Sequence, residues 1–163
     1  MRLLCDEMLG STARWLRAAG YDAALAAPGK PDVDLLARCR LEGRVLVTRD
    51  RKLVAPAGAG VQIVLLNDDG DEAQAMALSR GLGVDWTHAP FTRCLVDNTP
   101  LRPAGDADLL RIPEQSRELP GPFRVCPCCG RVFWPGSHVR RMRAKLERWR
   151  ELAALSGQGA GPS

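Results

Sequence analysis

The sequence lacks any apolar run approaching the roughly 18 residues of a membrane span, which argues against a membrane-spanning protein. It also lacks an amino-terminal secretory signal, because Asp6 and Glu7 interrupt the first apolar stretch. There is no internal repeat, and low-complexity composition is confined to residues 156–163. We therefore expect a cytoplasmic protein with no membrane partner and a tail that has nothing to bury.

What the sequence does contain fits an ordinary globular protein. Its 163 residues are 45% hydrophobic and 26% charged, and the net charge of +4 is compatible with an anionic partner. A chain of this size buries about two-thirds of its unfolded surface, enough for a core without disulfides. Six cysteines without a secretory signal indicate reduced thiols or metal ligands.

Short apolar blocks alternate with amphipathic segments in the first half of the chain. We expect strands at residues 2–5, 21–26, 45–48 and 61–66, and helices at residues 11–19, 32–41 and 71–80. Ser11 and Asp32 are expected to cap helices. The expected helix ends are Gly20, Gly43 and Gly81. This alternation predicts an α/β fold with a parallel sheet flanked by helices.

The composition changes near residue 87, where proline, cysteine and arginine accumulate. We expect a sheet domain over residues 1–86, a small loop-rich module with a basic helix over 87–155, and a disordered tail over 156–163. The helix is expected from residue 137 to 155 because one apolar stripe recurs at spacings of three and four residues. That stripe consists of Val139, Met142, Leu146, Trp149 and Ala153.

Two of the predicted strands end on an aspartate, Asp6 and Asp50. The carboxyl ends of parallel strands share one edge of the sheet, so these side chains are expected to meet there. Asp32 and Asp34 open the helix before the strand that leads to Asp50, and Glu7 adjoins Asp6. Carboxylates gathered at one point require a cation, and oxygen ligands suit Mg²⁺ or Mn²⁺. Such an ion can cleave a phosphodiester.

The acidic residues also have simpler explanations. Asp32 is a good helix cap, and Asp34 favours the helix dipole. Asp50 can be a solvated loop residue paired with Arg49 or Arg51. Turn and cap roles are expected for Asp68, Asp69 and Asp71.

The cysteines of the second half form two knuckle-like turns. The second, Cys126 to Cys129 followed by a glycine, has the spacing of a zinc knuckle, whereas the first has Asp97 in place of its second cysteine. The predicted structural zinc ligands are Cys94, Asp97, Cys126 and Cys129. Cys128 and His138 are alternatives to Asp97, and loss of metal binding is a third possibility.

A basic helix beside such a cluster favours contact with nucleic acid. The residues expected to bind RNA, which we expect to be single-stranded, are Arg14, Arg17, Trp134, Arg140, Arg141, Arg143 and Lys145. The alternative to RNA binding is a helix that packs through its apolar stripe while its arginines are exposed to solvent.

Several motifs together resemble the Mut-seven C-terminal RNase domain family, a PIN-like nuclease fold followed by a zinc ribbon. They include CDEMLG, ARWLR, LVTRDR and RVFWPGSH, at residues 5–10, 13–17, 46–51 and 131–138. The resemblance, from about residue 2 to 145, implies a metal-dependent ribonuclease. Its acidic positions match Asp6, Asp32 and Asp50. Its ribbon cysteines match Cys94, Cys126 and Cys129, and Asp97 departs from the pattern. The alternative function is a non-catalytic RNA-binding or ribosome-associated module of the same fold.

Overall fold

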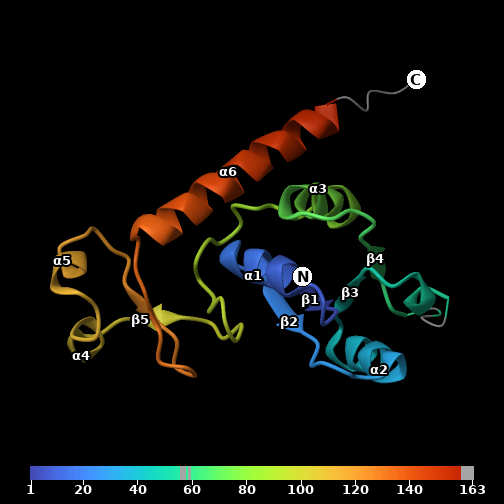
Figure 1. The fold of residues 1–163 in the computed structure, drawn as a ribbon, viewed down its shortest axis with the longest axis horizontal. Coiled ribbons are helices and arrows are strands. Elements are labelled where there is room, and N and C mark those ends of the chain that lie inside the picture. The colour runs from blue at the N-terminus through green and yellow to red at the C-terminus, as the bar shows by residue number, and fades with distance from the viewer. Residues whose placement is uncertain (56–57, 59, 159–163) are drawn as a thin grey trace.

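The computed structural model describes residues 1–55, 58 and 60–158 of the chain. Its first half contains a four-stranded parallel sheet with the strand order β2-β1-β3-β4 (Figure 1). The strands are β1 Arg2–Cys5, β2 Asp22–Leu25, β3 Val45–Thr48 and β4 Ile63–Leu65. Each lies within a stretch where the sequence predicts a strand, so the predicted parallel α/β sheet is confirmed.

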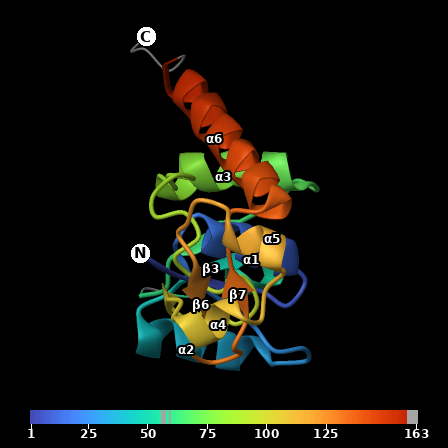
Figure 2. The same ribbon diagram turned by 90° about the vertical axis from the view of Figure 1, so that its left-hand side faces the viewer.

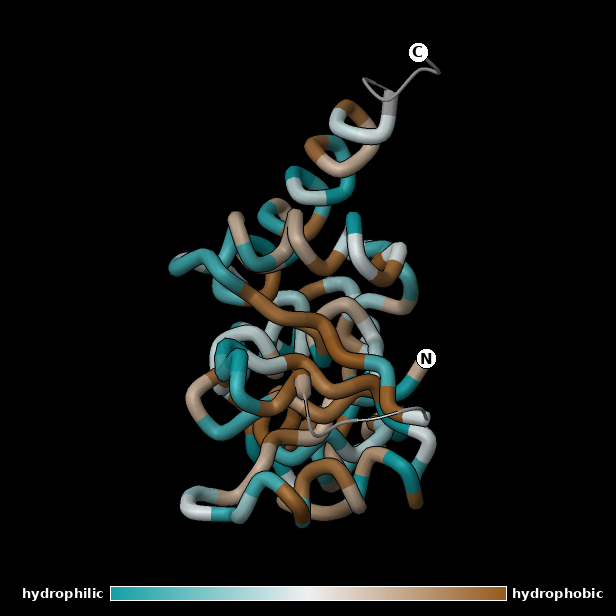
Figure 3. The backbone as a smooth tube through the Cα atoms, turned by 90° about the vertical axis from the view of Figure 1, so that its right-hand side faces the viewer, coloured by the Kyte–Doolittle hydropathy of each residue, from teal (hydrophilic) through white to brown (hydrophobic). Residues whose placement is uncertain are grey.

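Helices cover both faces of this sheet, as predicted. They are α1 Gly10–Ala18, α2 Asp32–Glu42 and α3 Asp71–Leu82. Alternate residues of β1 enter two separate hydrophobic clusters, because Leu3 and Cys5 face α1 and α3 while Leu4 faces α2. The strands therefore read as continuous apolar runs (Figure 3), which is the signature of a parallel sheet buried on both sides.

Both predicted helix caps are wrong. Helix α1 begins at Gly10, and the Ser11 hydroxyl donates a hydrogen bond of 2.8 Å to the carboxylate of Asp71 instead of capping its own helix. Helix α2 begins at Asp32 itself, because Pro31 occupies the capping position and offers no side-chain acceptor. Both aspartates at the start of α2 thus lie in its first turn, where they favour the helix dipole.

Two of the predicted helix ends are confirmed and two are wrong. Helix α1 ends at Ala18, with Ala19 as its cap, and Gly20 follows with φ of 99°, as predicted. Gly43 ends α2 in the left-handed conformation, as predicted, with φ of 62°. Helix α3 passes through Gly81 and ends at Leu82, because Gly83 takes the left-handed conformation there. The last helix, α6 Ser137–Gln158, continues past its predicted end, so the predicted disordered tail is wrong for residues 156–158. Residues 159–163 of that tail lie outside the described residues.

The segment after residue 87 is loop-rich, as expected, but it contains short regular elements that the sequence did not predict. Three two-residue strands form an antiparallel sheet in the order β5-β6-β7 (Figure 2). They are β5 Arg102–Pro103, β6 Arg124–Val125 and β7 Val132–Phe133, accompanied by the short helices α4 Asp106–Leu109 and α5 Glu114–Arg117. The 3₁₀ turn η1, Arg51–Leu53, follows β3 in the first half.

Helix α6 packs across α3 through its predicted apolar stripe. Met142, Leu146 and Trp149 are buried in the same hydrophobic cluster as the upper face of the parallel sheet. Trp149 meets the rings of Trp15 and Trp86 edge-on, with ring centroids 4.9 and 5.0 Å apart. The helix after the cysteine module is therefore part of the core that surrounds the sheet. In the part of the chain that the structure describes, no helix is long and apolar enough to cross a bilayer.

Candidate active site and metal centre

The aspartates that follow β1 and β3 lie at the same edge of the sheet. The two strands are parallel neighbours, with Cys5 paired to Val47. A single buried hydroxyl connects the residues beyond them, because Thr48 Oγ1 donates to Asp6 Oδ2 at 2.9 Å and accepts from the Asp50 amide at 3.0 Å. The fold thus places Asp6 and the Asp50 backbone around one fixed point.

Backbone amides also hold both carboxylates. Asp6 Oδ1 accepts from the amide of Glu7 at 2.7 Å, and Asp50 Oδ1 accepts from the amide of Lys52 at 2.8 Å, which caps η1. Both aspartates are half-buried. Each carboxylate is oriented by the chain that follows it, yet each remains accessible from solvent.

The other predicted acidic residues lie around this edge without closing it. Asp32 and Asp34 are exposed, and Glu7 Oε2 accepts from the amide of Gly29 at 2.7 Å, which ties the loop before α2 to the end of β1. Among the described residues, no three acidic groups at this edge offer oxygens within 4.8 Å of one another. The expected gathering of three carboxylates is therefore not found at that distance, and the roles of Asp32, Asp34 and Glu7 remain predictions.

Asp71, expected to serve a turn or cap, has a different role. It accepts hydrogen bonds from Ser11, from Trp15 Nε1 at 2.9 Å and from Lys145 Nζ at 3.3 Å. Burial alone raises the pKa of Asp71, but these hydrogen bonds outweigh it and hold the pKa below its ordinary value. Asp71 thereby joins α1, α3 and α6. Asp69, also placed in a turn by the sequence, forms an ion pair with Arg49 beside the acidic edge.

Four potential metal ligands converge in the second half of the chain. One ligand atom each from Cys94, Asp97, Cys126 and Cys129 lies within 4.8 Å of the others, and the sulfur atoms of Cys94 and Cys129 are 3.7 Å apart. Tetrahedral zinc with bonds of about 2.3 Å to sulfur places thiolates about 3.8 Å apart, so these donors fit a single zinc ion. The structure leaves Cys128 and His138, the two alternatives to Asp97, outside this group.

Local turns prepare this cluster. The Gly130 amide donates to the Cys126 carbonyl at 2.9 Å, and Gly130 has φ of 76°, which favours glycine. In the first turn the Thr99 amide donates to Asp97 Oδ1 at 2.9 Å. Burial raises the pKa of Asp97, but the hydrogen bonds from Thr99 outweigh it and keep the carboxyl ionised. An ionised carboxylate among thiols is suited to a cation.

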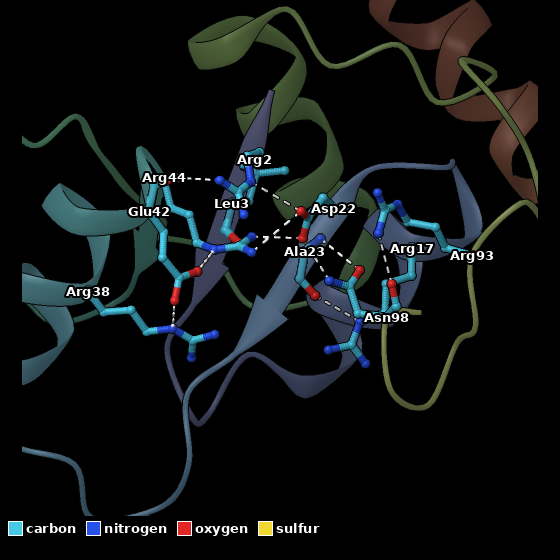
Figure 4. A network of polar contacts seen from close by, with 10 residues as sticks. All are labelled: Arg2, Leu3, Arg17, Asp22, Ala23, Arg38, Glu42, Arg44, Arg93 and Asn98. Carbon is cyan, nitrogen blue, oxygen red and sulfur yellow. Dashed lines mark hydrogen bonds and ion pairs between the residues drawn. The ribbon is translucent and has the colours of Figure 1, made fainter. Parts of the chain in front are cut away.

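The first cysteine turn is fastened to the edge of the parallel sheet by polar side chains that the sequence did not single out (Figure 4). Asn98 donates to Asp22 at 2.7 Å and accepts from the amide of Ala23 at 3.0 Å, which pairs the free edge of β2. Asp22 also accepts from Arg44 at 2.7 Å, and Arg44 further donates to Glu42. Burial raises the pKa of Asp22, but hydrogen bonds from Arg44 and Asn98 outweigh it and hold the pKa below its ordinary value.

Arg17 belongs to this connection and not to an RNA-binding surface. Its side chain is buried and donates to the carbonyls of Ala23, Leu95 and Val96 at 2.8 to 3.1 Å. The prediction that Arg17 binds RNA is therefore wrong, because the three carbonyls occupy its guanidinium inside the fold. The sequence signal that was missed is its position four residues after Ala13, which places it on the buried face of α1.

The remaining predicted RNA contacts divide into two groups. Lys145 lies over the rings of Trp15 and Trp149, and Arg143 lies over the ring of Phe91 at 5.1 Å. Those two cations therefore also stabilise the packing of α6. The others are exposed or half-buried at the surface: Arg14, Trp134, Arg140 and Arg141.

A parallel α/β sheet with aspartates at adjacent strand ends, followed by a ribbon-like module in which three cysteines and an aspartate converge, defines the class of this protein. Within that class, the family model of the Mut7-C RNAse domain matches residues 1–146, and the chain belongs to this family. The human protein "Exonuclease mut-7 homolog" is 35% identical over 101 residues, which cover 60% of this chain and 12% of the human protein. No solved structure matches the chain. The name of the family refers to an RNAse, and the name of the human protein refers to an exonuclease.

Proposed function

We propose that the protein is a metal-dependent ribonuclease of the PIN-like class, which hydrolyses RNA phosphodiester bonds at the edge of the parallel sheet. The observation that carries this proposal is the Thr48 hydroxyl, which binds the carboxylate of Asp6 and the backbone of Asp50 at once. A buried residue that orients two carboxylate-bearing positions is typical of a functional site, because outer partners of metal ligands tune them.

Asp6 and Asp50 are the proposed ligands of Mg²⁺ or Mn²⁺, with Asp32 as the third. Mg²⁺ usually binds through one or two carboxylates together with waters and substrate phosphates, so a pair of aspartates is sufficient to begin a site. When bound, such an ion lowers the pKa of water and stabilises the leaving oxygen. Asp34 and Glu7 lie near enough in sequence to assist, and Glu7 also holds the loop before α2 through Gly29.

The cysteine cluster is proposed to hold structural zinc. Its four protein ligands leave no open position for substrate, so its contribution is to the folding of the small module. Because its thiols must stay reduced, we place the protein in the cytoplasm. Arg14, Arg140 and Arg141 are the proposed contacts of the RNA backbone.

A second candidate function is RNA binding without cleavage. It is favoured by the incomplete gathering of the carboxylates, since no three of them come within 4.8 Å among the described residues. The two functions differ in one respect, because only the ribonuclease requires the aspartates.

The test is cleavage of end-labelled single-stranded RNA in the presence of Mn²⁺ or EDTA. We expect cleavage by the unaltered protein with Mn²⁺ and none with EDTA. The double variant Asp6→Asn, Asp50→Asn should lose activity by about 1,000-fold or more, as removal of charge-stabilising groups does in other enzymes. Glu151→Gln, an exposed acid on α6, is the matched control and should cleave normally. Cleavage that survives in the double variant would refute the proposal.

A further inference from the structure

Three adjoining hollows surround one aromatic segment between β7 and α6. All three are lined by Phe133 and Val139. The largest, of about 530 Å³, has Trp134 and Leu119 in its wall, and a neighbour of about 430 Å³ lies toward α1. Both volumes fall in the range of small-ligand sites, about 300–1,000 Å³. The surface is therefore hollowed where its aromatic side chains are grouped.

The charges around these hollows have one sign. Arginines contribute to each of them, and no described residue that lines them is acidic. The five arginines are Arg14, Arg124, Arg131, Arg140 and Arg143. An apolar floor with a rim of guanidinium groups suits a ligand that is aromatic in one part and anionic in another.

A glycine allows the Trp134 ring to take its place in the wall. The Gly136 amide donates to the Trp134 carbonyl at 2.8 Å, which turns the chain tightly. A Cβ atom on Gly136 would lie 3.0 Å from Trp134 Nε1, closer than side chains normally approach. The ring therefore rests against its own turn and is held in a defined position, as a stacking platform must be.

We propose that the hollow bounded by Trp134 and Leu119 binds an unpaired base of single-stranded RNA, while the surrounding arginines contact the adjacent phosphates. This rests on the proposed function, since it assumes an RNA substrate. Bases stack on aromatic rings when they are unpaired, whereas bases inside a duplex already stack on each other and cannot enter a side pocket. The binding surface therefore selects single strands.

Arg14 connects this surface to the acidic edge. It lies on α1, about one helical turn, or ~5.4 Å along the axis, beyond the first residue Gly10. The start of α1 follows Asp6 after a short loop, and Arg14 donates to His138 Nε2 at the start of α6. Single-stranded RNA bound at the aromatic hollow therefore passes Arg14 before it reaches Asp6.

The experiment measures binding of labelled single-stranded and duplex RNA of equal length, in buffer without added Mn²⁺ or Mg²⁺, so that cleavage does not interfere and zinc stays bound. Fluorescence anisotropy should show that Trp134→Ala weakens single-strand binding by about tenfold and leaves the weaker duplex binding unchanged. Trp134→Phe should retain most of the affinity. Arg150→Gln, a charge change elsewhere on α6, is the control and should bind single strands normally. Equal single-strand binding by Trp134→Ala and the unaltered protein overturns the proposal.

A second readout avoids dependence on a destabilised variant. Single-stranded RNA should quench tryptophan fluorescence of the unaltered protein, and most of that quenching should vanish in Trp134→Phe. Quenching that persists in Trp134→Phe overturns the proposal. The two proposals fail separately, because absence of cleavage by the unaltered protein in Mn²⁺ would refute the ribonuclease, whereas RNA binding measured without Mn²⁺ tests only the base-binding site.

Discussion

The two candidate metal sites of this protein are built in opposite ways. In the cysteine cluster, four ligand atoms lie within 4.8 Å of one another on two tight turns. At the sheet edge, two strands deliver Asp6 and Asp50 to a common hydroxyl, and the further acids stay exposed. In the cysteine cluster the protein alone brings four potential ligands together. At the sheet edge no such group of four is found among the described residues.

This difference matches the chemistry expected of each site. A structural zinc ion needs all its ligands from the protein, because an open position would bind water and add nothing to folding. A catalytic ion must keep coordination positions for the phosphate and for water, so the proposed magnesium site needs fewer protein ligands than the zinc site. The polar network through Asp22 and Arg44 lies at the opposite, amino-terminal ends of the strands, where it fastens the first cysteine turn to the sheet.

The largest expected effect comes from breaking the closed site. Cys126→Ser removes a buried ligand, and zinc affinity should fall by more than about 100-fold, since even outer partners of metal ligands contribute 10- to 100-fold. Competition with a chromogenic chelator measures this affinity. The control Cys128→Ser alters an exposed cysteine outside the cluster and should bind zinc normally. A strong loss in the control instead would show that the cluster is wrongly assigned.

The next largest effect concerns the polar network that connects the first cysteine turn to the parallel sheet. Arg44 is 7% exposed and donates to Asp22, Glu42 and the Leu3 carbonyl. Arg44→Met leaves these acceptors without their main donor and should lower the free energy of unfolding by about 3 kcal/mol. Urea denaturation measures the change.

Arg38→Met serves as its control. That arginine is 41% exposed and pairs with Glu42 across one helical turn. Its loss should change the free energy of unfolding by less than about 1 kcal/mol. Equal effects of the two substitutions would contradict the role given to the Arg44 network.

A moderate effect is expected at the open site. Thr48→Val removes the hydroxyl that joins Asp6 to Asp50 while keeping a similar shape. Affinity for Mn²⁺, measured by titration calorimetry, should fall by about tenfold, and zinc content should not change. Unchanged Mn²⁺ affinity would mean that this hydroxyl has only a structural role.

Acid should weaken the polar network around Asp22. The pKa of Asp22 lies below its ordinary value, so its contribution to stability is fully present above the unfolded value of about 3.9 and is lost as the pH falls below it. Asp22→Asn should therefore be less stable than the unaltered protein at neutral pH, with a difference that narrows on acidification. Thermal melts at a series of pH values check this sign.

The smallest effect is expected at an exposed ion pair between α3 and α6. Arg148 pairs with Glu72 where both side chains are largely exposed. Arg148→Gln should leave the melting temperature, zinc content and RNA cleavage within experimental error. A clear loss of cleavage would place this face of α6 in the RNA-binding surface.

The sequence predicted the sheet and the cysteine cluster well, for physical reasons. Buried parallel strands need unbroken apolar blocks, and such blocks are visible at β1 and β3. Metal ligands need particular residue types at fixed spacings, so Cys126 and Cys129 can be recognised as candidate ligands from the sequence. The position of Asp6 and Asp50 at the same edge of the sheet follows from the parallel pairing of their strands.

What the sequence did not predict depends on long-range contacts. Nothing local indicates that Asn98 would pair the edge of β2, or which backbone carbonyls would accept hydrogen bonds from Arg17. The caps at Ser11 and Asp32 failed because tertiary bonding to Asp71 and the preceding Pro31 took precedence over local preference. Strands of two residues, such as β5, carry no periodic signal at all.

The most direct test of two separate and dissimilar sites is Mn²⁺ binding measured by electron paramagnetic resonance in zinc-loaded protein. The account predicts that bound Mn²⁺ disappears in Asp6→Asn, Asp50→Asn, whose zinc content stays normal, and persists in Asp97→Asn. Mn²⁺ that remains bound in the sheet-edge variant, or that is lost on changing Asp97, would contradict it.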